Sequence, residues 1–316
     1  MRPATPMRLS ILGPLEVHDR HGTLVEVTGV KRRALLATLV VRAGRTLSAD
    51  RLIVELWGER PPANAANALQ AHIRRLRKVV EVACGEPDRI VTRPPGYFLS
   101  LRPGETDAEE FVEQVGLAKA LAGTEPDRAV PLLRSALELW RGPALEGCVA
   151  GDLCAAGAVV LEEHRLTTLE TLYDASLRAG RHGEVIGELE ETSATYPLRE
   201  RFYDQLMVAL YRSDRQSDAL GVYDRARRRL LHELGVEPGP VLRARMQSIL
   251  TNNPTTALDL EPVPAQGFVQ TEGAELSREL AALQQRIDTL ASRQEALLES
   301  LRTLAPDPAP QELPRG

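Results

Sequence analysis

The stretch PANAANALQAHIRRLRKVV, residues 62–80, decides the fold of the N-terminal part of the chain. Read at about 3.6 residues per turn, its large apolar residues fall on one stripe suited to a core, namely Leu69, Ile73, Leu76 and Val80. The opposite face gathers polar and basic side chains around the small Ala71, namely Asn64, Asn67, Arg74, Arg75 and Lys78. Amide and guanidinium groups of this kind reach base edges and phosphates in a DNA major groove. The alternative is an ordinary solvated basic face.

Charge is divided unevenly along the chain. Residues 1–103 hold 17 lysines and arginines against 9 acidic residues, whereas the remaining residues hold 22 against 35. A basic N-terminal module joined to an acidic body indicates that the N-terminal part meets a polyanion. The alternative is chance clustering, with these arginines paired to local acids.

Length and composition fit roughly two to three domains with real cores, since 43% of the 316 residues are hydrophobic. Cys84, Cys148 and Cys154 are odd in number and form no CxxC pair, which argues against a disulfide framework. The N-terminus lacks the charged-then-apolar form of a signal peptide, and the longest apolar run, Ala34–Val41, is too short to span a bilayer. We therefore expect a cytoplasmic protein with no membrane partner.

Residues 7–103 have the element order of a small α+β domain. The pattern predicts strands at Arg8–Val17 and Thr23–Val27, helices at Lys31–Arg42, Ala49–Trp57 and 64–82, and a hairpin of Ile90–Thr92 with Tyr97–Leu101. Ser48 is a suitable cap for the middle helix. The tip of the hairpin is Arg93-Pro94-Pro95-Gly96.

Strands, three helices and a hairpin, in this order, are typical of a winged helix-turn-helix. In that fold the third helix enters the major groove, and the hairpin can reach the neighbouring backbone or minor groove. Arg93 at the hairpin tip is suited to this second contact. Tyr97 is expected in the core of the hairpin rather than on DNA.

Residues 106–251 read as nearly continuous helices, with Thr106 or Asp107 as the first cap. An internal repeat at an offset of 34 aligns Leu172, Leu177, Arg181, Val185, Ile186 and Leu189 with Leu206, Tyr211, Arg215, Ala219, Leu220 and Tyr223. This period is typical of TPR-like helix pairs, which stack and leave a concave surface for partners.

The same segments resemble a known family of regulators. LGPLEV, KRRALLATLVV, SADRLIVELWGERPP, NALQAHIRRLRK and RPPGYFL resemble the N-terminal domain of the Streptomyces antibiotic regulatory protein (SARP) family, which is related to the OmpR-type winged helix. TDAEEF, ALELWRGPALEG and LLHELGVEPGPVLR resemble the bacterial transcriptional activation domain that follows it. The resemblance covers about residues 7–250.

The resemblance implies a transcriptional activator that binds direct repeats at promoters, typically beside secondary-metabolite (antibiotic) gene clusters. It also implies contact with RNA polymerase holoenzyme, and it links the helical domain to dimerisation and activation. The loop 58–63 is our candidate for part of the polymerase contact, and a plain helix connector is the alternative.

The C-terminal residues depart from this pattern. Residues 252–272 are rich in proline and threonine and predict a flexible linker, and 306–316 predict a disordered tail. Within 273–305, residues at alternating steps of four and three form a heptad pattern, namely Leu276, Leu280, Leu283, Ile287, Leu290, Gln294, Leu297, Leu301 and Leu304. We expect this coiled-coil-like helix to assist homo-oligomerisation, with a dimer favoured. Packing of one amphipathic helix on its own protein is the alternative.

Sites for catalysis, metals or cofactors are not indicated. The six histidines form no HExxH motif and no Cys/His cluster with zinc spacing, and there is no GxSxG and no GxxxxGK[ST]. We therefore expect no cofactor and no enzyme activity.

The fold class that follows is mostly α: an N-terminal winged helix-turn-helix (small α+β), a TPR-like all-α domain, and a C-terminal coiled-coil-like helix. The function that follows is sequence-specific activation of transcription on double-stranded promoter DNA. Base contacts are assigned to Asn64, Asn67, Arg74 and Arg75, and phosphate contacts to Lys78, Arg93, Arg32, Arg33 and Arg45. The alternative function is a helical-repeat interaction adaptor whose winged helix does not bind DNA.

Overall fold

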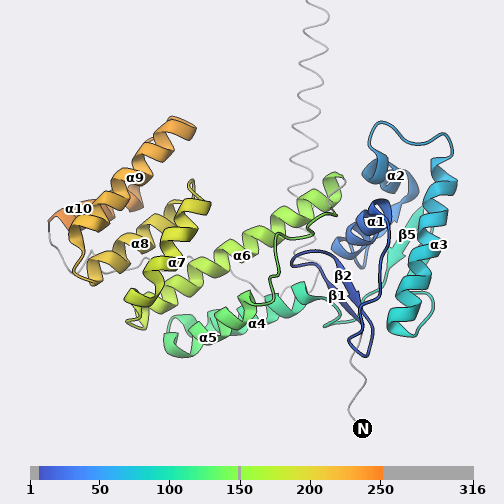
Figure 1. The fold of residues 1–316 in the computed structure, drawn as a ribbon, viewed down its shortest axis with the longest axis horizontal. Coiled ribbons are helices and arrows are strands. Elements are labelled where there is room, and N and C mark those ends of the chain that lie inside the picture. The colour runs from blue at the N-terminus through green and yellow to red at the C-terminus, as the bar shows by residue number, and fades with distance from the viewer. Residues whose placement is uncertain (1–6, 149–150, 252–316) are drawn as a thin grey trace, which may run out of the picture. The chain divides into compact units, whose positions relative to one another are not determined.

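The computed structural model describes residues 7–148 and 151–251, which belong to one compact unit. Its N-terminal part contains β1 (Arg8–Ser10), β2 (Glu16–His18), α1 (Val30–Val41), β3 (Thr46–Ser48), α2 (Ala49–Trp57), α3 (Ala65–Cys84), β4 (Ile90–Arg93) and β5 (Gly96–Leu99). The helical part contains α4 (Asp107–Ala122), α5 (Pro126–Leu137), α6 (Asp152–Arg178), α7 (His182–Thr195), α8 (Glu200–Arg212), α9 (Gln216–Leu234) and α10 (Pro240–Leu250). A small α+β domain followed by an all-α domain confirms the predicted fold class for these residues (Figure 1).

The N-terminal domain is a winged helix. Three helices pack on an antiparallel sheet with the strand order β3-β5-β4, in which Tyr97 of β5 lies opposite Leu47 on one side and Thr92 on the other. The hairpin β4–β5 packs tightly on β3, because a Cβ added to Gly96 would lie 1.8 Å from the carbonyl oxygen of Leu47. Glycine is therefore required at this position.

Local sequence sets the ends of α2 and α3. The hydroxyl of Ser48 accepts a hydrogen bond from the backbone N–H of Arg51 at 3.2 Å, which confirms Ser48 as the cap of α2. Gly58, with φ of 59°, ends α2, and Gly85 ends α3 in the left-handed conformation. The predicted apolar stripe of α3 is buried in the core.

The start of the chain differs from the prediction. Arg8–Val17 is two short strands that pair with each other, and Thr23–Val27 contributes only an isolated bridge between Leu24 and His18. The predicted single strand is interrupted at Gly13 and Pro14, since Gly13 has a φ of 144° and proline has no N–H to donate. Strand β3 was not predicted, because its three residues are too few to show an alternation of apolar and polar side chains.

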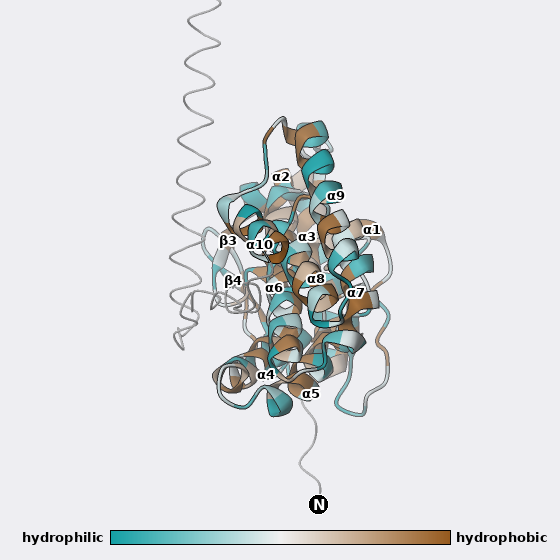
Figure 2. Ribbon diagram, turned by 90° about the vertical axis from the view of Figure 1, so that its left-hand side faces the viewer, coloured by the Kyte–Doolittle hydropathy of each residue, from teal (hydrophilic) through white to brown (hydrophobic). Residues whose placement is uncertain are grey.

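The helical domain repeats its turns at the predicted offset. The turn after α6 contains Gly180 with φ of 76°, and 34 residues later the turn after α8 contains Asp214 with φ of 58°. Arg181 N–H donates to Ser176 and Arg215 N–H donates to Leu210, at 2.9 and 3.0 Å. The TPR-like repeat of helix pairs is therefore confirmed. Figure 2 shows the mixture of apolar and polar residues along these helices that such stacking requires.

Helix α6 joins the two domains. It contacts α1 and α2 near its start and α7 and α8 further along (Figure 1). The buried carboxylate of Glu55 in α2 accepts hydrogen bonds from the N–H groups of Leu153 and Cys154, at 3.0 and 2.9 Å, in the first turn of α6. This contact satisfies N–H groups that a helix start otherwise leaves free.

A second buried carboxylate ties the helical domain to β1. Thr106 caps α4, since its hydroxyl accepts from Glu109 N–H, and Asp107 does not serve as the cap. Asp107 instead accepts hydrogen bonds from the N–H groups of Ile11 and Leu12, at 2.8 and 3.1 Å. Burial raises the pKa of Asp107, although these hydrogen bonds act in the opposite direction.

The predicted linker 252–272, helix 273–305 and tail 306–316 lie outside the described residues, and so do all the heptad positions from Leu276 to Leu304. Within the described part, no helix is long and apolar enough to cross a membrane.

Candidate nucleic-acid interface

The outer face of α3 is exposed and free of partners. Asn64, Asn67, Arg74, Arg75 and Lys78 are all exposed, and within the described residues none of their side chains forms a hydrogen bond or an ion pair. Asn64 stands at the N-cap position of α3, but its side chain makes no capping bond. The structure therefore brings these five predicted residues together on one accessible face.

Arg77 lies on the flank of α3 and has a different role. Its Nε donates to the carbonyl of Ile90 at 2.8 Å, and its Nη2 donates to the hydroxyl of Thr92 at 2.7 Å. These bonds tie α3 to β4 and so fix the helix against the hairpin. Sequence reasoning did not identify this anchor, because both of its partners lie more than a dozen residues further along the chain.

The hairpin presents Arg93 at its tip. Arg93 is exposed, and its guanidinium lies over the ring of Phe98, 4.5 Å from the ring centroid. This stacking orients the charged group while its N–H donors stay accessible. Tyr97 is buried, with 8% of its surface exposed, which confirms its predicted place in the core.

The other three predicted phosphate contacts come from two places. Arg32 and Arg33 lie in the first turn of α1, and Arg45 lies in the turn before β3; all three are half-buried. Arg32 acts electrostatically on His72 of α3, as Arg75 does, so α1 and α3 share one basic region. Arg45 instead acts on the buried Arg42, whose pKa is lowered mainly by burial.

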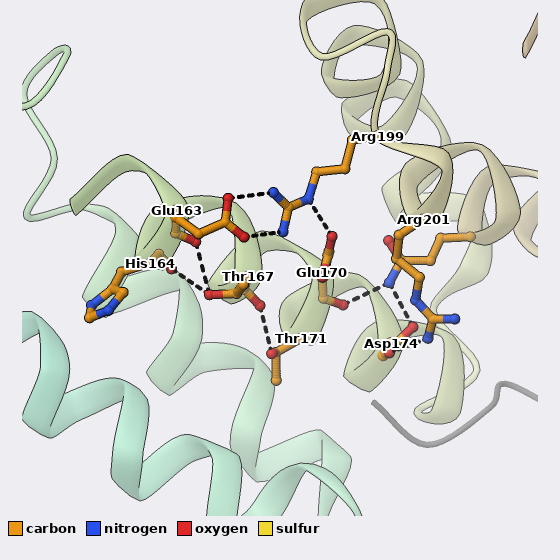
Figure 3. Close-up of polar contacts among 9 residues, drawn as sticks. Glu163, His164, Thr167, Glu170, Thr171, Asp174, Arg199 and Arg201 are labelled. Carbon is orange, nitrogen blue, oxygen red and sulfur yellow. Dashed lines mark hydrogen bonds and ion pairs between the residues drawn. The ribbon is translucent and has the colours of Figure 1, made fainter. Parts of the chain in front are cut away.

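Two arginines near the start of α8, Arg199 and Arg201, are engaged by carboxylates of α6 (Figure 3). Arg199 donates to both oxygens of Glu163, at 2.7 and 2.8 Å, and to Glu170 at 2.5 Å. Arg201 donates to Asp174 at 2.6 Å. These contacts join α6 to the start of α8, and they hold the helix pairs together rather than offering charge to a partner.

In the described ranges, no group of three or more His, Cys, Asp or Glu side chains could hold a metal ion.

Two family models together match most of the described residues. Residues 24–99 match the family model "Transcriptional regulatory protein, C terminal", and residues 106–250 match "Bacterial transcriptional activator domain". The chain is 45% identical to the transcriptional regulator RedD of Streptomyces coelicolor over 251 residues, which is 78% of this chain and 71% of RedD. It is 37% identical to the regulatory protein DnrI of Streptomyces peucetius over 83% of this chain and 99% of DnrI.

A solved structure shows the same fold. The chain resembles Mycobacterium tuberculosis EmbR, solved in complex with a low affinity phosphopeptide, with a TM-score of 0.73 and 36% identity. The match covers 78% of this chain and 65% of the EmbR chain, so about a third of EmbR has no counterpart in it.

A winged helix with an exposed basic third helix, followed by stacked helix pairs, and the two matching domain families together define a DNA-binding transcriptional regulator of the activator class. The chain belongs to the Streptomyces antibiotic regulatory protein family.

Proposed function

We propose that this regulator places α3 in the major groove of promoter DNA and activates transcription there. The observation that carries the proposal is the outer face of α3, where exposed cations and amides have no partner within the described residues. Asn64, Asn67, Arg74 and Arg75 contact bases, and Lys78, Arg93, Arg32, Arg33 and Arg45 contact phosphates. Since these phosphate contacts are basic side chains, affinity falls as salt rises.

Family membership supports the wider parts of the proposal. The protein binds direct repeats, recruits RNA polymerase holoenzyme through a contact that includes the loop 58–63, and controls secondary-metabolite biosynthesis genes. It works in the cytoplasm, where promoter DNA lies, with no catalytic step and no cofactor.

Residues 273–305 assist self-association in this proposal, as a coiled coil in a dimer. The heptad pattern supports it. Sedimentation of the full chain, compared with a Leu283→Asp, Leu290→Asp variant, tests it. We expect the variant to have a lower mass at the same concentration, and identical masses would contradict a role of this segment.

Selection of binding sites from fragmented genomic DNA, using the purified full-length protein, tests the central proposal. We expect enrichment of fragments that carry direct repeats spaced by about one helical turn, since that spacing places two winged helices on one side of the duplex. Absence of enrichment at low salt would contradict DNA binding. Affinity for a captured protein that does not change with salt would instead support the adaptor function.

A further inference from the structure

Three helices bring a histidine and three cations together beside the base-reading face of α3. His72 of α3 is half-buried against Trp57 of α2, with ring centroids 6.0 Å apart and planes at 35°. The charged groups that act on its ring are Lys31 and Arg32 from the first turn of α1 and Arg75 from the next turn of α3. From α2, the ring meets the uncharged indole of Trp57.

This basic cluster has an excess of positive charge. The first turn of α1 contains Lys31, Arg32 and Arg33 and no acidic residue. The helix start has no side-chain capping bond. Cations at a helix N-terminus are unfavourable, because the helix dipole is positive at that end. The guanidinium of Arg32 lies over this end, since a Cβ added to Gly29 would be 3.1 Å from its Nη2.

No acidic side chain of the described residues forms an ion pair with this cluster. Lys31 donates to the carbonyl of Leu56, which uses one of its three N–H groups. The imidazole ring of His72 forms no hydrogen bond within the described residues, and its Nδ1 is buried without a partner. Burial, followed by the charges of Arg32, Arg75 and Lys31, lowers the pKa of His72, so the ring is mainly neutral at neutral pH.

An anion at this position would change the balance of charge. A DNA phosphate carries one negative charge and accepts hydrogen bonds from guanidinium groups with favourable geometry. A phosphate next to Arg32 would offset the part of the pKa lowering that the neighbouring cations cause, which adds to the larger effect of burial, and a protonated imidazole donates from both nitrogens.

We propose that Arg32 and a protonated His72 together hold one backbone phosphate of duplex DNA, next to the base-reading Arg75, so that docking is accompanied by uptake of a proton. The inference rests on the proposed function, since it takes duplex DNA as the ligand of this face. It adds His72 as a contact residue and makes DNA affinity depend on pH near neutrality.

The sign of the pH dependence follows from linkage. The pKa of His72 lies below its ordinary value of 6.5 in the free protein and rises when the phosphate is bound. Affinity therefore increases as pH falls through the pKa of the bound state, and it levels off below the pKa of the free state. One proton taken up changes affinity by at most about tenfold per pH unit.

The test measures binding of the full-length chain to a random-sequence duplex of about 30 base pairs at low salt, from about pH 8 to pH 6, by fluorescence anisotropy. A random duplex is sufficient because a phosphate contact is independent of sequence. We expect the wild-type affinity to rise several-fold more over this range than that of His72→Gln. The matched control is His232→Gln, since His232 is a well-exposed histidine on α9 and its removal should leave the pH dependence unchanged.

Isothermal titration in two buffers of different ionisation enthalpy measures the proton itself. We expect net proton uptake by the wild-type chain on DNA binding, reduced in His72→Gln and also in Arg32→Gln. Should His72→Gln fail to fold, the NMR titration of the His72 ring in the wild-type protein decides, through an upward shift of its pKa when duplex is added.

The outcomes separate this inference from the proposed function. Duplex binding with the same pH dependence in wild type and His72→Gln, or an unshifted His72 titration, would overturn the inference and leave DNA binding intact. Failure of the wild-type chain to bind any duplex at any of these pH values would overturn both.

Discussion

The arginines of α3 and those between α6 and α8 are the same residue type in opposite situations. The side chains of Arg74 and Arg75 are exposed and have no hydrogen bond or ion pair in the part of the chain that the structure describes. Arg199 and Arg201 are largely covered and engaged by Glu163, Glu170 and Asp174 (Figure 3). The first set leaves its charge available to a polyanion, whereas the second set connects helices.

The number of arginines in a region does not by itself locate a binding surface. Many arginines of the helical domain pair with carboxylates, as Arg225 pairs with Glu190 and Arg227 pairs with Glu237. The outer face of α3 differs, because it gathers several exposed cations whose side chains form no ion pair among the described residues. Substitutions at paired arginines and their partners should therefore change stability, whereas substitutions at the free arginines of α3 should change DNA affinity.

The largest effect is expected at the buried pair of Asp204 and Arg245. Asp204 Oδ1 lies 2.6 Å from Arg245 Nε, and the two side chains are 2% and 5% exposed. Asp204→Ala removes the carboxylate that balances a buried guanidinium, which should lower the free energy of unfolding by about 3–5 kcal/mol. Urea denaturation measures the loss, and DNA affinity per folded molecule should not change.

Asp218→Ala is the matched control, because it removes the partner of Arg215 at a surface where both side chains are about half exposed. Its expected cost is at most about 1 kcal/mol. Equal losses in the two variants would mean that burial does not distinguish these pairs.

The next effect concerns DNA affinity and compares two arginines of one helix. Arg74→Ala should weaken binding to the selected site by about 1–3 kcal/mol and relax specificity at one base position, with stability unchanged within about 0.5 kcal/mol. Arg77→Ala should instead lower stability, since Arg77 anchors α3 to Ile90 and Thr92. Binding titrations and thermal unfolding of both variants measure this. A large loss of stability in Arg74→Ala would contradict its assignment to DNA.

Phosphate contacts should respond to salt rather than to sequence. Arg93→Ala and Lys78→Ala should each weaken binding to all duplexes about equally and lower the slope of log affinity against log salt by about one unit. Titrations at several salt concentrations, on a selected site and on an unrelated duplex, measure both quantities. If Arg74→Ala gave the same uniform loss as Arg93→Ala, the division into base and phosphate contacts would be wrong.

The positions of helices, of one helix cap and of the helical repeat could be predicted from the sequence. Periodicity placed α3 and its two faces, Ser48 identified the start of α2, and the predicted 34-residue offset equals the spacing of the turns at Gly180 and Asp214. Helix faces, caps and repeats follow from the order of residue types along the chain, so the sequence carries them directly.

The contacts between distant segments could not be predicted. The sequence offered Asp107 only as a possible cap and gave Glu55 no role, yet the partners of both carboxylates are backbone N–H groups more than 90 residues away. Backbone groups leave no mark in the sequence, so no spacing reveals such a pair. The cluster of His72, Trp57 and Arg32 was not predicted either, because its residues come from three separate helices.

A smaller effect is expected at the equivalent turns of the helical repeat. Gly180→Ala places a Cβ on a left-handed backbone and should cost about 1–2 kcal/mol. Asp214→Gly relieves the same conformation in the next repeat and should stabilise by up to about 1 kcal/mol. Urea denaturation measures both, and DNA affinity should be unchanged. Effects of the same sign in both variants would mean that the two turns are not equivalent.

The smallest effect is expected at Glu163, the partly exposed partner of Arg199. Arg199 holds the pKa of Glu163 below its ordinary value of 4.5, chiefly through their hydrogen bonds. The stability from this pair is therefore present above that value and lost as pH falls through the pKa of the folded state. Because Glu163 is 53% exposed, Glu163→Gln should cost only about 0.5 kcal/mol at neutral pH.

The pH dependence of this deficit distinguishes an ion pair from mere packing. Unfolding of wild type and Glu163→Gln, followed from neutral pH to below about pH 4, should show the difference shrinking as Glu163 of the wild type becomes protonated. Glu113→Gln is the control, since Glu113 is exposed on α4 and makes no ion pair within the described residues. A deficit that stays constant with pH would mean that Arg199 connects α8 to α6 through its packing, and that its charge contributes nothing there.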